Sequence, residues 1–305
     1  MAGRIVVGTS SWADPGFVAE WYPRGMRPRD RLGCFEAVEL NSSFYAIPDP
    51  NTTERWAQET PDGFTFHVKL HRLLSRHSGE PRSLPPDLRD DATAGSGGRV
   101  ALTPELEQAM AGATLEAVAP LADAGKLGAF LLQLSPSFDP RRHDLDELDG
   151  LLEALAPHPA AVELRHRGWV EGERARRTMA HLSDRGAVWV GVDSPRSDHF
   201  TIMPPVDAVT REDMAYLRAH GRNAKGYISG RSVAERFGYA YSDDELHQIA
   251  ERAGELAGEA GVVNVMFNNN RGADAPVAAR RMRELLGQDP GPAPEPARGQ
   301  LQMPG

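Results

Sequence analysis

The sequence of 305 residues contains one cysteine, Cys34, so the chain cannot form an internal disulfide. Its apolar runs are short, as at 129–132, and none is long enough to span a bilayer. The N-terminal residues 1–12 enter a strand-like pattern without the apolar core of a signal peptide. We therefore expect a soluble, cytoplasmic protein with no membrane association.

Positive charge is outweighed by negative charge, because 34 lysines and arginines stand against 43 aspartates and glutamates and the net charge is −9 at pH 7. Overall acidity argues against general binding of nucleic acids. Phosphate-binding loops of the G-x-x-x-x-G-K-[ST] and G-x-G-x-x-G types are missing, as are C-x-x-C, H-E-x-x-H and G-x-S-x-G. The absence of these loops argues against nucleotide binding of those types, and no motif identifies a cofactor.

Short β-branched runs alternate with longer helical patterns, which predicts βαβ units around a parallel sheet. Most runs are continuously apolar, as expected for strands covered on both faces. Eight such runs predict a single (β/α)8 barrel. The expected strands are Ile5–Thr9, Ala37–Leu40, Phe64–Leu70, Gly128–Leu134, Ala160–Leu164, Val188–Val192, Met214–Leu217 and Val262–Phe267.

Helices are expected between these strands, and several carry start or stop signals. Thr103 is a candidate N-cap with proline next to it, and Ser242 with Glu245 forms a capping-box pattern. The expected helices are Thr52–Glu59, Pro104–Leu121, Leu145–Leu155, Glu173–Arg185, Ser242–Glu259 and Pro276–Leu286. We expect one barrel domain over 1–287, a mobile loop at 83–99 and a disordered tail rich in proline and glycine at 288–305.

Polar or titratable residues follow or end the expected strands, where the active sites of such barrels lie. A carboxylate in a buried strand is costly unless it is paired, so Glu39 and Glu163 must meet cations or donors inside the barrel. Alternation of side chains places Glu39 and Asn41 on one face of their strand, and likewise Glu163 and Arg165. The candidate catalytic residues are Glu39, Glu163, Asp193 and His220.

Cations from three strands, Lys69, Arg165 and Arg218, are expected to bind a phosphate, sulfate or carboxylate. Glu163 and His220 are the best candidates for an acid–base pair, while His220 could instead only bond to the scaffold. Tyr45 could stack on a ligand or pack in the wall. The candidate binding residues are Asn41, Tyr45, Lys69, His77, Gln133, Arg165, Arg218, Asn268 and Asn269.

The chain resembles the YecE-like family, known as domain of unknown function 72, along its length except for the tail. The motifs that carry the resemblance are VGTSSW (7–12), VELNSSFYAIP (38–48), FTFHVKL (64–70), FLLQLSPSF (130–138), AVELRHRGW (161–169), VGVDSP (190–195), YLRAHGRN (216–223), YAYSDDEL (239–246) and VMFNNNRGADAP (265–276). The resemblance implies a (β/α)8-type barrel and no particular activity. The family's Thr-His pair after the third-strand lysine is missing, and Ser75 or His77 could replace it.

Three functions agree with these residues. The first is an enzyme that acts on a small anionic substrate by acid–base chemistry at the strand ends. The second is a divalent-metal-dependent isomerase or hydrolase that uses Glu39, Glu163, Asp193 and His220, although the neighbouring arginines would repel a cation. The third is a module that binds nucleic acid or protein through a basic, aromatic rim, against which the overall acidity counts.

Overall fold

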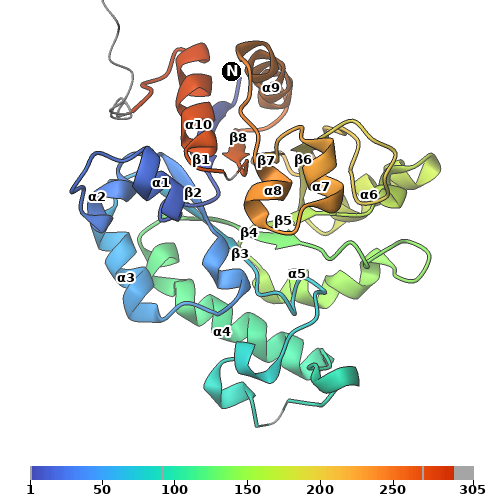
Figure 1. Ribbon diagram of the computed structural model, residues 1–305. Helices are drawn as coiled ribbons and strands as arrows, with labels where there is room; N and C mark the ends of the chain where they lie inside the picture. The colour runs from blue at the N-terminus through green and yellow to red at the C-terminus, as the bar shows by residue number, and fades with distance from the viewer. Residues whose placement is uncertain (1, 91, 270, 292–305) are drawn as a thin grey trace, which may run out of the picture.

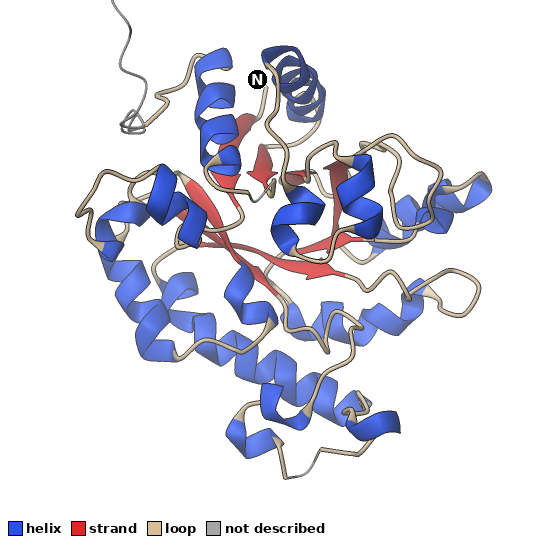
Figure 2. Cartoon of the chain, viewed as in Figure 1, coloured by secondary structure: helices blue, strands red, loops and turns tan. Residues whose placement is uncertain are grey.

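A computed structural model describes residues 2–90, 92–269 and 271–291. Its eight strands form one closed parallel barrel in chain order, in which β8 pairs with β1. The barrel lies at the centre and the helices surround it (Figures 1 and 2). The strands are β1 (Arg4–Thr9), β2 (Ala37–Leu40), β3 (Thr65–Lys69), β4 (Leu127–Gln133), β5 (Ala160–Glu163), β6 (Val188–Asp193), β7 (Met214–Ala219) and β8 (Val262–Phe267). The sequence prediction of a single (β/α)8 barrel is confirmed.

The described residues contain ten α-helices. They are α1 (Pro15–Glu20), α2 (Pro28–Leu32), α3 (Pro50–Glu59), α4 (Pro104–Asp123), α5 (Asp149–Leu155), α6 (Glu173–Asp184), α7 (Ala224–Ser229), α8 (Val233–Phe237), α9 (Asp243–Ala257) and α10 (Asp274–Leu285). The side chain of Thr103 accepts from the backbone of Leu106, and the capping box of Ser242 and Glu245 is present. These contacts satisfy N–H groups that a helix start leaves free.

Two expectations about the elements need correction. Residues 145–155 form a 3₁₀ turn, Leu145–Leu148, followed by α5, and not one continuous helix. All five leucines of this segment are nevertheless buried, because the leucine period describes the buried face and not the hydrogen-bond pattern. The helices α1, α2, α7 and α8 were not expected, since each is only five or six residues long.

The described residues of the segment 83–99 form no long element, only 3₁₀ turns and a bridge from Ala94 to Val100. Its mobility and the division into one domain and a tail stay predictions. Of the tail, Gln288 donates to the carbonyl of Ile5 in β1 at 2.9 Å, and residues 292–305 lie outside the described part. None of the described helices combines the length and apolar character that crossing a bilayer requires.

Candidate active site at the barrel mouth

The strand register decides which side chains enter the barrel. Residues paired across parallel strands point to the same side, and successive residues alternate. Glu39 of β2 pairs with His67 of β3, and Gln133 of β4 pairs with Glu163 of β5. Contacts across the barrel show that this is the interior side, because Glu39 and Glu163 both reach Arg218 of β7.

Arg218 is the centre of the interior network. Its Nε and Nη2 donate to the two carboxylate oxygens of Glu39 at 2.8 and 2.7 Å, and its Nη1 donates to Glu163 Oε2 at 2.5 Å. All three side chains are at most 1 % exposed. The hydroxyl of Tyr216 adds a bond to Glu39 at 2.9 Å. The guanidinium thus lies bound between two carboxylates, with each of its three nitrogens donating to one of them.

The arginine keeps both carboxylates ionised. Burial alone would raise their pKa values, since a charge is poorly solvated inside the barrel. For Glu39, the attraction and hydrogen bonds of Arg218 outweigh burial and lower the pKa. For Glu163, Arg218, His220 and Arg165 together hold the pKa well below its usual range. Neither carboxyl group therefore carries a proton at neutral pH.

His220 lies beside Glu163, as the predicted acid–base pair requires. Its Nε2 is 3.1 Å from Glu163 Oε1, and its Nδ1 is 2.9 Å from the amide nitrogen of Asn268. Because the carboxylate only accepts and the amide NH₂ only donates, the neutral ring carries its proton on Nε2. Burial lowers the pKa of His220 despite the opposing effect of Glu163. A catalytic role for this fully enclosed pair stays a prediction.

Lys69 and Gln133 connect the interior network to the mouth, which is the end of the barrel where the strands finish. Lys69 donates to Gln133 Oε1 at 2.7 Å, and Gln133 donates from Nε2 to Glu163 Oε1 at 2.8 Å. The ammonium lies 4.5 Å from the centre of the Phe44 ring. Burial, followed by repulsion from Arg218, lowers the pKa of Lys69 to about 7. Lys69 as a whole residue is partly exposed, whereas its amine lies among Gln133, Phe44 and the charged groups of the network.

Arg165 and His77 border Lys69. Arg165 packs over the ring of Tyr227 in α7, and its Nε is 3.7 Å from Glu163 Oε1, too far for a hydrogen bond. Among the described residues, Arg165 Nε and His77 Nε2 are buried without a hydrogen-bond partner. Burial, with Lys69 and Arg165 as further causes, lowers the pKa of His77 to about 4. Two polar nitrogens thus lack partners where the network reaches the mouth.

Asp193 lies elsewhere, which corrects the expectation that it shares a cavity with Glu39 and Glu163. It pairs with Ala219, the neighbour of Arg218, and so faces the helices. There it contacts Arg222 at 2.8 Å, the Tyr241 hydroxyl at 2.8 Å and Arg252 of α9 at 3.3 Å. The predicted convergence of four residues on a metal ion is therefore not formed.

The remaining candidates are spread around the mouth. Asn41 donates to the carbonyl of Ser10, and Asn269 donates to the carbonyl of Tyr239. Tyr45 is 62 % exposed and packs edge-on against Phe44. Their binding roles stay predictions. Of the two candidates for the missing Thr-His pair, Ser75 is fully buried, whereas His77 packs edge-on against Phe44.

Sequence reasoning missed four contributors to the network. Tyr216 holds Glu39, and Tyr227 covers Arg165. Deeper in the barrel, His67 Nε2 lies 3.2 Å from Asn264 Oδ1. A usable signal was the spacing Tyr216, Arg218, His220, which places all three on one face of β7.

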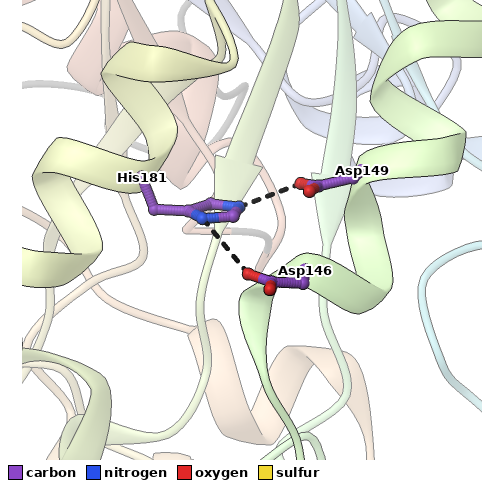
Figure 3. Close-up of side chains that lie close together, drawn as sticks. All are labelled: Asp146, Asp149 and His181. Carbon is purple, nitrogen blue, oxygen red and sulfur yellow. Dashed lines mark hydrogen bonds and ion pairs between the residues drawn. The ribbon is translucent and has the colours of Figure 1, made fainter.

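One cluster has the composition of a metal site. Asp146, Asp149 and His181 lie close together between the α5 region and α6, on the outer helical layer (Figure 3). His181 contacts both carboxylates, and Arg185 forms an ion pair with Asp149 at 2.6 Å. Arg185 already balances the charge of Asp149, and the cluster is separate from the barrel interior. It is the sole group of this type among the described residues.

Comparison with known proteins decides the family. The family model described as "Protein of unknown function DUF72" matches residues 6–300. The chain belongs to this family. UPF0759 protein YunF of Bacillus subtilis is 29% identical, with 92% of this chain and 94% of YunF covered. UPF0759 protein YecE of Escherichia coli K12 is 28% identical over 62% of this chain and 59% of YecE.

Solved structures of DUF72 proteins have the same fold. A protein of Thermotoga maritima superposes with a TM-score of 0.74 at 26% identity, covering 93% of this chain and all of that one. A protein of Enterococcus faecalis V583 gives 0.74 at 25% identity, covering 93% and 98%. The resemblance noted in the sequence is thus confirmed.

Proposed function

We propose that this DUF72 protein is an enzyme that binds a small anionic substrate at the barrel mouth and transfers protons there through Lys69. The observation that carries the proposal is the charge balance of the network. The two negative charges of Glu39 and Glu163 are balanced by the two positive charges of Arg218 and Arg165, without a contribution from Lys69. A protonated Lys69 therefore leaves a surplus positive charge beside the unpartnered Nε of Arg165.

An anion satisfies both groups at once. Its oxygens would accept from Arg165 Nε and from the ammonium of Lys69, and charge-assisted bonds of this kind are the strong ones. With a pKa of about 7, Lys69 can release or accept a proton at neutral pH, as a general acid or base must. Arg218 has its three nitrogens bound to carboxylates, so we assign it to holding Glu39 and Glu163 and not to binding substrate.

Ligand-dependent melting tests the proposal. Phosphorylated and carboxylated metabolites, divalent metals and short oligonucleotides are screened, because a ligand that binds the folded state stabilises it by mass action. We expect a phosphate- or carboxylate-bearing metabolite to raise the melting temperature. The increase should disappear in Arg165→Met and persist in Arg176→Met, which removes the same charge from an exposed pair. Equal increases in both variants would contradict the proposal.

The pH dependence gives a second readout. The protonated form of Lys69 binds the anion, so affinity should be high below pH 7 and fall as pH rises through about 7. Calorimetric titration with the best metabolite at several pH values measures this decline. Lys69→Met should remove the decline together with most of the affinity. A profile that is unchanged in this variant would assign the titration to another group.

A further inference from the structure

Lysine is rare in this chain, and one of its three lysine residues, Lys69, lies at the mouth. The sequence has 34 lysines and arginines together, of which only Lys69, Lys126 and Lys225 are lysines. Lys126 is buried and donates to the carbonyls of Ala57 and Thr60. Lys225 is exposed in α7. Lys69 is the lysine that reaches the charged network.

The surroundings of Lys69 favour a neutral amine. No carboxylate of the described residues lies within ion-pair distance of its Nζ, which contacts an aromatic ring and one amide oxygen. Burial disfavours its positive charge most, Arg218 and Arg165 repel that charge, and the attraction of Glu163 and Glu39 offsets only part of the resulting fall in pKa. Desolvation and neighbouring cations are the two means by which proteins activate a lysine as a nucleophile.

Gln133 fixes the orientation of that amine. Glu163 is ionised and can only accept, so the NH₂ group of Gln133 must face it at 2.8 Å. The amide oxygen of Gln133 then faces Lys69 and accepts one of its N–H bonds at 2.7 Å. A neutral Lys69 held by an N–H bond keeps its lone pair free for a carbon atom at the mouth.

We propose that Lys69 forms an imine with the carbonyl group of a small anionic aldehyde or ketone, whose anionic group is held by Arg165. This rests on the anion site proposed above and names its substrate class. The amine nitrogen attacks the carbonyl carbon and forms a C–N bond. The C–O bond then breaks, the oxygen leaves as water with the two amine hydrogens, and a C=N bond remains. No oxidant or reductant is consumed.

Reductive trapping with pyruvate as the probe tests the imine. Pyruvate carries a ketone beside a carboxylate, and cyanoborohydride reduces an imine to a stable secondary amine. Peptide mass spectrometry should show Lys69 heavier by the mass of pyruvic acid less one oxygen atom. Lys225 is the internal control, because it is exposed and belongs to the same molecules. We expect labelling of Lys69 to exceed that of Lys225 at least tenfold at pH 7.

Variants and pH separate this chemistry from chance reactivity. Arg165→Met should reduce labelling of Lys69 by about tenfold, the effect of losing about 1.4 kcal/mol of binding. Acetone, which lacks the anionic group, should show no such dependence on Arg165. Labelling of Lys69 should also increase as pH rises through about 7 and then reach a plateau. Equal labelling of the two lysines in the folded protein would overturn the proposal.

The failure of the imine and the failure of the anion site give different results. Calorimetric titration with inorganic phosphate measures the anion site without a carbonyl group. If phosphate binding is lost in Arg165→Met while pyruvate leaves Lys69 unlabelled, the imine is refuted and the anion site stands. If neither phosphate nor pyruvate responds to the Arg165 substitution, both proposals fail.

Discussion

Replacing Arg218 by methionine tests the network at its centre. The substitution leaves Glu39 and Glu163, both fully buried, without the cation that binds them at 2.5–2.8 Å. Removing one partner of a buried ion pair costs about 3–5 kcal/mol, and here one side chain serves two carboxylates. Since a domain is stable by only about 5–15 kcal/mol, we expect Arg218→Met to lose a large part of its free energy of unfolding at pH 7.

Arg218→Lys gives a measurable intermediate. Lysine keeps the charge but cannot make the paired bonds to Glu39, so it should lose part of the stability and still fold. Urea denaturation followed by circular dichroism measures the free energy of unfolding of both variants. Arg176→Met, an exposed arginine with an exposed partner, is the control and should behave as the unmodified protein.

The pH dependence of stability should also change sign in the methionine variant. In the unmodified protein the folded pKa values of Glu39 and Glu163 are lowered, so their contribution is present above the unfolded value of about 4.3 and lost as pH falls through the folded values. Without Arg218, the burial that raises both pKa values is opposed only by the remaining neighbours, Tyr216 and His67 for Glu39 and His220 and Arg165 for Glu163. Arg218→Met should therefore become more stable as pH falls from 7 to 5. A decrease in the free energy of unfolding of less than about 1 kcal/mol at pH 7 is well under the cost of an unpaired buried charge. It would show that Glu39 and Glu163 do not depend on Arg218.

Two further substitutions test the barrel and its histidine. Gly8→Ala should prevent stable folding or lower the melting temperature strongly, because an added Cβ would lie 2.2 Å from the carbonyl oxygen of Ala37. A melting temperature within a degree or two of that of the unmodified protein would show that β1 and β2 can move apart to accept the methyl group. Asn268→Asp places a carboxylate beside His220 Nδ1 and should raise the pKa of His220, which an NMR titration of the imidazole measures; an unchanged pKa would mean that the Asn268 contact does not control this ring.

The sequence predicted the barrel because its signals were local and repeated. Every strand was placed to within a residue or two, and Ala37–Leu40 and Val262–Phe267 match their observed bounds. Alternation within one strand also placed Glu163 and Arg165 on one face, where the two side chains lie 3.7 Å apart. The short helices α7 and α8 could not be predicted, because five or six residues carry too little apolar periodicity to show a face.

The site was predicted less completely, since it depends on contacts between distant strands. Buried Glu39 and Glu163 required cations or donors inside the barrel, but from the sequence we assigned Arg218 to an anionic ligand. The sequence could not show that Arg218 binds both carboxylates at once. From these contacts we assign Arg218 to the interior network and not to the ligand. The sequence also could not show that Asp193 faces the helices, because a strand end in the sequence does not state which face its last residue takes.

Anomalous diffraction from crystals soaked in selenate shows whether Arg165 and Lys69 together bind an oxyanion. Selenate is a tetrahedral oxyanion like phosphate, and selenium marks its position without a model of the ligand. We expect an anomalous peak from a selenate whose oxygens lie within hydrogen-bond distance of Arg165 Nε and Lys69 Nζ. This peak should be absent from Arg165→Met crystals. Selenate bound only at other arginines, with Arg165 and Lys69 unoccupied at pH 6, would contradict the proposed anion site.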